Sequence, residues 1–165
     1  DVERSRGLGD VYKRQEEMVI VERVTGPAVQ VNAIATTDQL AALQALCREV
    51  YVDPSLMQYA VRLVSATRTP DKHGLKDMAR LMTYGASPRA TIGLVEGARA
   101  LAVLRGRSYA LPEDMVDLVP DVLRHRVVLS YEGLSEGLTS DALVERIMKA
   151  VPVPARPLEH EKKAA

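Results

Sequence analysis

Apolar residues recur at spacings of three and four positions along most of this chain, which is the pattern of helices that bury one face. The strongest stretch follows Ser87-Pro88, where a capping serine and a proline at the first helical position open a helix that Gly106 ends. Asp53-Pro54 and Thr139 open helices in the same way. The pattern predicts helices over 14–25, 38–50 with Thr37 as cap, 54–68, 88–106, from Pro112 onward, and 140–150.

The spacing also predicts which side chains face inward. Each predicted helix carries one stripe of aliphatic residues, and charged residues fill the remaining positions. We expect these stripes to be buried: Leu40, Leu43, Cys47 and Val50; Met57, Ala60, Val61 and Val64; Ile92, Val95, Ala98, Leu101 and Ala102, with Leu94 and Leu104 beside them; Leu143, Val144, Ile147 and Ala150.

The segments between the helices read as connections. Residues 28–36 are interpreted as an extended connector, and 70–86 as a long connection with a short amphipathic turn in it. Connections of that length inside a compact domain are often functional. Pro120 is expected to interrupt its helix, and a loop is expected around Gly133 and Gly137. The result is an all-α bundle of about five helices.

Composition and charge narrow the class. The 165 residues include 22 Lys and Arg and 22 Asp and Glu, so the formal net charge is zero, and 47% are hydrophobic with no Phe or Trp. This excludes a disordered chain and gives no basic excess for nucleic acid or a membrane surface. Cys47, the single cysteine, cannot form an internal disulfide and is predicted to be a buried small hydrophobe in a reducing, cytoplasmic setting. No apolar run is long enough to span a bilayer.

Several kinds of active site are missing from the sequence. It contains no G-x-x-x-x-G-K-[ST] phosphate loop and no G-x-G-x-x-G motif. His73, His125 and His160 are scattered, and one cysteine cannot build a zinc site, so no metal is expected. We therefore do not expect this chain to be a complete enzyme by itself.

The most informative segment is Tyr84-Gly85-Ala86-Ser87-Pro88-Arg89. We expect Gly85 to permit an unusual backbone turn, and Ser87 to cap the helix that Pro88 opens. Arg89 then lies in the first helical turn, where its charge opposes the positive end of the helix dipole at a cost of about 0.3–1 kcal/mol. An anion at this place, such as a phosphate, would remove that conflict. A solvated arginine on a capped helix remains the alternative.

A family resemblance rests on motifs in this region. GASPRA (85–90) is followed by ALAVLRGRSYALPEDM (100–115) and VLRHR (122–126). In this order and spacing they resemble the C-terminal lid domain of MoxR-family AAA+ ATPases. The resemblance extends over about 16–155 and ends at the family-like VPVP (151–154). It implies a small all-α lid preceded by a remnant of the ATPase core.

The resemblance also implies a division of the chain and a role for one residue. Residues 1–13 would be an unrelated or artefactual leader, 14–37 the end of the core and hinge, 38–151 the helical lid, and 152–165 a disordered tail. Walker A, Walker B, sensor 1 and the arginine finger have no counterpart here and would lie upstream. Arg89 resembles sensor 2, the lid arginine that reaches the γ-phosphate. The neighbours that would shape its approach to ATP are Gly85, Ala86, Ser87 and Pro88.

The parent protein implied by the resemblance is a cytoplasmic ATPase that uses ATP and Mg²⁺ to remodel or activate client proteins. The 165-residue fragment alone is expected to bind neither ATP nor Mg²⁺. Its partners would be the upstream AAA+ core, neighbouring subunits of a homo-oligomeric ring and a protein with a von Willebrand factor A domain. No nucleic acid and no membrane insertion are expected.

Two other functions stay open on the residues alone. A free-standing helical adaptor would bind protein through an apolar groove, and a helix-turn-helix protein would bind DNA, although no basic stripe supports the latter. Arg124-His125-Arg126 is interpreted as a solvated helix end, or as a contact to a neighbouring subunit, a nucleotide phosphate or an acidic partner. Arg99, Arg105 and Arg107 are expected on an exposed face, and Glu96 is expected to pair with Arg99.

Overall fold

The computed structural model describes residues 15–28 and 32–154. The chain divides into two units, 1–37 and 38–165, which are described separately. In the first unit residues 15–25 form a helix whose apolar side chains are exposed. The predicted leader and most of the predicted tail lie outside the described residues, as does the middle of the 28–36 connector. The assignment of 14–37 to an ATPase core stays a prediction.

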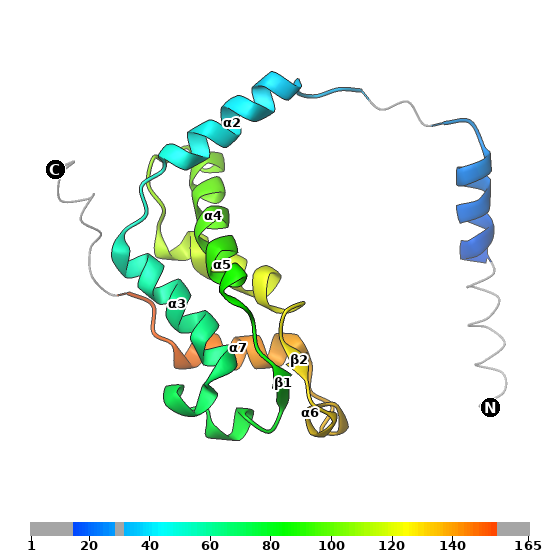
Figure 1. Ribbon diagram of the computed structural model, residues 1–165. Helices are drawn as coiled ribbons and strands as arrows, with labels where there is room; N and C mark the ends of the chain where they lie inside the picture. Colours follow the sequence, from blue (N-terminus) through cyan, green and yellow to red (C-terminus); the bar gives the residue numbers. More distant parts are fainter. Residues whose placement is uncertain (1–14, 29–31, 155–165) are drawn as a thin grey trace. The chain divides into compact units, whose positions relative to one another are not determined.

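Helices dominate the rest of the described chain, which confirms the all-α class (Figure 1). Two short strands form its small antiparallel sheet. In chain order the elements are α2 (Thr37–Glu49), α3 (Pro54–Arg68), the 3₁₀ helices η1 (Pro70–His73) and η2 (Lys76–Met78), β1 (Met82–Tyr84), α4 (Pro88–Leu104), α5 (Pro112–Leu123), β2 (Val128–Leu129), α6 (Tyr131–Ser135) and α7 (Ser140–Ala150).

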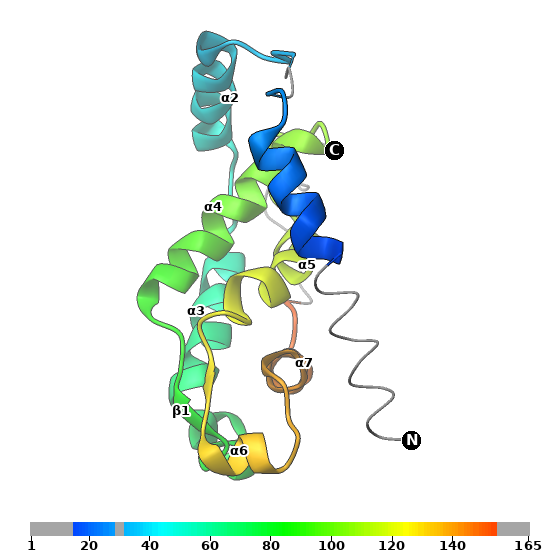
Figure 2. The same cartoon turned by 90° about the vertical axis from the view of Figure 1, so that its right-hand side faces the viewer.

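The core is mainly aliphatic and is centred on α4, which packs against α3 and α5, while α7 contacts α3 and α5 (Figures 1 and 2). Small residues let α4 approach α5 closely, because Gly93 and Gly97 face Val122 and Leu118. Tyr59 is the largest fully buried side chain, and burial raises the pKa of its hydroxyl. The other large, fully buried side chains are Leu56, Leu63, Met78, Leu81, Leu94, Met115, Leu123, Leu143, Ile147, Val64 and Val119.

Most predicted helix ends are confirmed, and their caps explain them. The Asp53 carboxylate accepts a hydrogen bond from the Ser55 amide, and Pro54 is the first residue of α3. Thr139 caps α7 by accepting from the Ala142 amide. Gly106 follows α4 with a φ of 72°, a left-handed conformation that ends a helix.

Several predicted inward faces are wrong. In α3, Met57 and Val61 are exposed, and Leu56, Tyr59 and Leu63 are buried instead. A helix with apolar residues on two sides buries the side that its neighbours cover, and local spacing does not reveal which. In α4, Ile92 and Leu104 are likewise exposed, and Ala90, Leu94, Ala98 and Ala102 are buried.

The expectation for α2 also fails. None of its residues is buried, and Leu40, Leu43 and Leu46 are 55%, 49% and 48% exposed. Cys47 is only partly buried. Only Val50, just after the helix, joins the core. The amphipathic stripe of α2 is therefore present, but the described part of the chain covers only its C-terminal end, at Cys47 and Val50, and leaves the leucines about half exposed.

Three local features differ from prediction. Pro120 does not interrupt its helix but lies inside α5, which continues to Leu123. One lost hydrogen bond is tolerated there because the buried Val119 and Leu123 hold both sides of the proline in the core. The loop after β2 contains the short helix α6, whose N-cap Ser130 accepts from the Gly133 amide. Strands β1 and β2 were not predicted.

Candidate functional site

Arg89 lies where the sequence places it, in the first turn of α4. The helix begins at Pro88 and has no acidic residue in that turn. The side chain of Arg89 is exposed, and no ion pair to it exists among the described residues. The positive end of the helix and an unneutralised guanidinium thus occur together, which is the arrangement that favours an anion.

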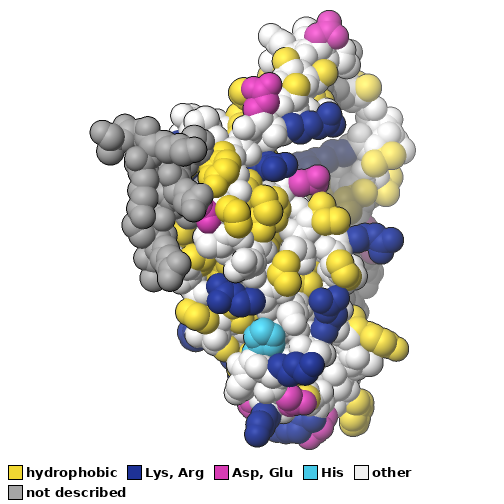
Figure 3. All heavy atoms as spheres, turned by 60° about the vertical axis from the view of Figure 1, so that its left-hand side comes forward, with side chains coloured by type: hydrophobic (Ala, Val, Ile, Leu, Met, Phe, Trp, Pro, Cys, Tyr) yellow, Lys and Arg dark blue, Asp and Glu magenta, His cyan; other side chains and the backbone are white. Residues whose placement is uncertain are grey.

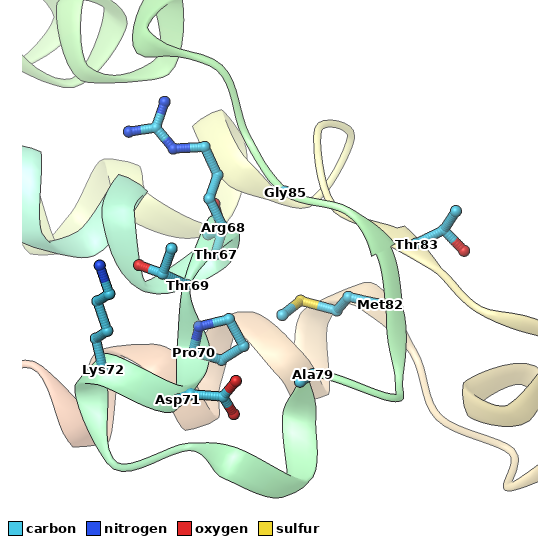
Figure 4. A pocket seen from close by; sticks show the side chains of 10 residues that line it. All are labelled: Thr67, Arg68, Thr69, Pro70, Asp71, Lys72, Ala79, Met82, Thr83 and Gly85. Atoms are coloured by element: carbon cyan, nitrogen blue, oxygen red, sulfur yellow. The ribbon is translucent and has the colours of Figure 1, made fainter.

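Glycine is required at position 85 for a different reason from the unusual backbone turn that was predicted. It does not have positive φ; among the described glycines only Gly74, Gly106 and Gly137 do. A Cβ at Gly85 would overlap the carbonyl oxygen of Thr67 and lie 2.8 Å from its Oγ1. Glycine is needed here because the strand leading into α4 passes directly against the end of α3 (Figure 4).

Thr67 fixes this contact and was not singled out from the sequence. Its buried hydroxyl donates to the Val64 carbonyl at 2.7 Å and accepts from the Ala86 amide at 2.8 Å. The hydroxyl therefore ties the segment before α4 to the last turn of α3. Nothing in the local pattern reveals this role, because the two partners are 19 residues apart.

Ser87 occupies the N-cap position but does not act as predicted. Its backbone is extended, with φ −78° and ψ 167°, yet its side chain makes no capping hydrogen bond. Its carbonyl accepts from the Ala90 amide at 2.9 Å. Because this side-chain cap is not formed, the Ser87 hydroxyl does not offset the positive end of α4.

The other end of this segment is held by the small sheet. Met82 pairs with Leu129 and Tyr84 with Val128. The Ser130 hydroxyl donates to the Arg80 carbonyl at 2.7 Å. The segment from β1 to Arg89 is thus anchored at the sheet, at Thr67 and in the helix, which fixes the direction of the approach to α4.

A cavity of about 250 Å³ with mixed polar and apolar walls lies beside Gly85, between the end of α3, η1 and β1 (Figure 4). Arg68, Thr69 and Lys72 contribute basic and hydroxyl groups to its wall, and Asp71 contributes a carboxylate. Its volume is below the roughly 300–1,000 Å³ of typical small-molecule pockets, so it suits a compact polar group rather than a whole nucleotide.

Arg105 is exposed as predicted, whereas Arg107 is partly buried. Both donate to Asp114, whose carboxylate is fully buried: Arg105 Nη1 at 2.7 Å and Arg107 Nη2 at 2.6 Å from Oδ1. The Leu111 amide donates to the same carboxylate at 2.7 Å. Burial alone would raise the pKa of Asp114, but these hydrogen bonds outweigh it and hold the pKa below its ordinary value. This cluster positions the turn before α5.

The remaining arginine predictions have mixed outcomes. Glu96 and Arg99 form no ion pair in the described residues, and Arg99 Nε is buried without a partner. In the second basic cluster, Arg124 pairs with Asp121 at 3.0 Å and with Asp141 at 3.2 Å, so it joins α5 to α7. His125 Nδ1 lies 3.1 Å from the Asp121 carbonyl. Arg124 is thus an exposed helix end, as interpreted, and it also carries ion pairs to exposed carboxylates on α5 and α7.

The surface carries no continuous basic stripe on the face shown in Figure 3, where Lys and Arg side chains are scattered among hydrophobic ones. A DNA-binding surface would need such a stripe. In residues 15–28 and 32–154, no helix has the length and apolar character to cross a membrane.

Comparisons with known proteins agree with the motifs. A family model described as "AAA lid domain" matches residues 75–147, which include the Arg89 segment and α5. Chaperone MoxR1 of Mycobacterium tuberculosis is 38% identical over 140 residues, covering 85% of this chain and 37% of the relative. Protein MoxR of Paracoccus denitrificans is 40% identical over 111 residues, covering 64% of this chain and 32% of the relative.

A solved structure is similar to this chain in fold as well as in sequence. The crystal structure of a "putative ATPase" from Cytophaga hutchinsonii matches with a TM-score of 0.72 and 33% identity, over 85% of this chain and 43% of that one. The chain thus spans about two-fifths of the length of these relatives. With the lid model, the MoxR relatives and the shared fold in agreement, the chain belongs to the MoxR family of AAA+ proteins and contains its lid domain.

Proposed function

We propose that this chain is the nucleotide-sensing lid of a cytoplasmic AAA+ ATPase that hydrolyses ATP to remodel or activate client proteins. The observation that carries the proposal is Arg89, which is exposed and unneutralised at the positive end of α4 in a MoxR-family lid. An AAA+ core would hold ATP and Mg²⁺ through its Walker A and B residues. Neighbouring subunits of a homo-oligomeric ring and a von Willebrand factor A protein are the proposed partners.

The residues of this chain suit a phosphate group. No acidic side chain lies in the first turn of α4, and no capping hydroxyl offsets its positive end. Arg89 would bind the γ-phosphate and stabilise the charge that develops during phosphoryl transfer. Because Thr67 and the small sheet fix the segment before α4, binding at Arg89 would be transmitted to the whole lid.

The test is the ATPase activity of the protein that carries this lid together with its AAA+ core. We expect Arg89→Ala to lower kcat by about 10²–10³-fold, as for other removed transition-state donors, with an unchanged circular dichroism spectrum. Arg89→Lys should retain part of the activity because it keeps the charge but loses the planar guanidinium. The matched control is Arg62→Ala, an exposed arginine on α3. Wild-type turnover in Arg89→Ala would refute the sensor role.

A second candidate function rests on α2. Its exposed side chains include Leu40, Leu43 and Leu46. They form an apolar stripe that a helical adaptor would present to a protein partner. ATP turnover that depends on Arg89 favours the lid, whereas stable partner binding without any nucleotide effect favours the adaptor.

A further inference from the structure

Arg68, the last residue of α3, carries a charge that no carboxylate of the described residues neutralises, as Arg89 does. Its side chain is exposed, and no ion pair to it is found within the described ranges. Five arginines of the lid are paired with carboxylates: Arg80 with Glu132 and Glu136, Arg105 and Arg107 with Asp114, Arg124 with Asp121 and Asp141, and Arg146 with Asp77. Arg68 and Arg89 have no such partner in the described ranges, and the same holds for Arg48, Arg62, Arg99 and Arg126. What sets Arg68 apart from these four is its position beside the segment that leads to Arg89.

The two arginines are attached to one rigid junction. Thr67 directly precedes Arg68, and its Oγ1 accepts from the Ala86 amide three residues before Arg89. The Gly85 backbone passes so close to the Thr67 carbonyl that no side chain fits between them. The end of α3 is therefore held against the segment that leads into α4.

The direction of Arg68 supports a shared ligand. In Figure 4 its guanidinium points to the side on which the chain runs from Gly85 into α4, away from Asp71 at the opposite end of the cavity. The negative end of α3 favours a cation at Arg68 but does not neutralise it. Two guanidinium groups that both reached the positive end of α4 would repel each other, and an anion between them would remove that repulsion.

We propose that Arg68 is a second anion-binding residue of the Arg89 site, so that both guanidinium groups bind the polyphosphate chain of one nucleoside triphosphate. This inference rests on the proposed function and extends it from one arginine to two. Guanidinium suits the task because its fork of donors matches phosphate oxygens. The small cavity beside Arg68 has no room for the rest of a nucleotide, which would lie against the AAA+ core.

The test is a titration of the 165-residue chain with inorganic tripolyphosphate, followed by NMR of the arginine Nε–H signals, with sodium sulfate of equal ionic strength as the screening control. We expect the Arg68 and Arg89 signals to move with one common midpoint, while the Arg62 signal stays in place. Arg68→Ala should weaken tripolyphosphate binding about fivefold, the effect of losing one solvent-exposed charge-assisted hydrogen bond. Arg62→Ala should bind as the wild type does.

The outcomes separate this inference from the proposed function. If Arg89 moves while Arg68 stays in place, or if Arg68→Ala binds tripolyphosphate as tightly as the wild type, the two-arginine site is wrong and the sensor role of Arg89 is untouched. If sulfate moves both signals equally well, general screening explains the shifts and the site is also overturned. The sensor role itself is decided by ATP turnover of Arg89→Ala.

Discussion

The arginines of this lid differ in whether a carboxylate pairs with the guanidinium group. Arg107 and Arg89 both lie close to a helix start in the sequence. Arg107 meets the buried Asp114, whereas Arg89 meets no carboxylate in the described chain. Asp114 lies in the first turn of α5, where an acidic residue favours the helix dipole. Its burial, and with it the structural role of Arg105 and Arg107, depends on tertiary packing that the local pattern does not contain.

Replacing Asp114 by Asn should destabilise the fold by about 2–4 kcal/mol, because two arginines would lose their buried counter-charge. The free energy of unfolding in urea measures this loss. Asp117→Asn is the matched control, since Asp117 also pairs with Arg105 but is exposed, and a much smaller loss is expected there. Equal losses in the two variants would show that burial of Asp114 does not matter.

The stability contributed by Asp114 should also depend on pH. Its pKa is held below its ordinary value of about 3.8, so the unfolded chain binds this proton more readily than the folded one. The contribution is therefore complete above that value and is lost as the pH falls through the lower folded pKa. Urea unfolding between about pH 5 and pH 3 should show the gap between wild type and Asp114→Asn narrowing. A constant gap would contradict the assignment.

Among the elements, the connection from α3 to α4 was the least predictable. The sequence predicts a long connection with a short turn, and η1 and η2 confirm local structure there. Strand β1 has three residues and β2 two, too few for a period-two pattern to show. The GASPRA motif singled out the entry to α4, and its role as a functional site stays a prediction. The reason for its glycine, contact with Thr67, was hidden because that contact joins distant positions.

A series of Gly→Ala variants tests this contact. Gly85→Ala should destabilise the fold most, because its Cβ would overlap the backbone of Thr67, which cannot move aside as a side chain would. Gly97→Ala should cost less, since its Cβ meets only the flexible Leu118 Cδ1 at 2.8 Å. Gly93→Ala should be neutral or stabilising by up to about 1 kcal/mol, because its nearest neighbour is at an ordinary 3.8 Å and alanine favours helix. Thermal unfolding ranks the three, and any other order contradicts the model of the junction.

For the whole molecule, helix positions could be predicted from caps and spacing, whereas the buried faces could not. Asp53 and Thr139 define their helices locally, and both caps are confirmed. Met57 and Val61 fit an inward stripe as well as Leu56 and Tyr59 do, and only the arrangement of neighbouring helices decides between them. The stripe of α2 shows the same limit, because it has the pattern of a core helix without a partner in the described chain.

The exposed stripe of α2 leads to a last prediction, made by comparing two leucines. Leu63→Ala on α3 removes a fully buried side chain and should cost about 2–5 kcal/mol. Leu43→Ala on α2 removes one that is 49% exposed and should change the free energy of unfolding by less than about 0.5 kcal/mol. Urea unfolding of the two variants measures both effects, and comparable losses would mean that α2 is packed in the folded chain. A negligible effect at Leu43 means that the α2 leucines do not stabilise the isolated chain, so their apolar surface remains available to a partner.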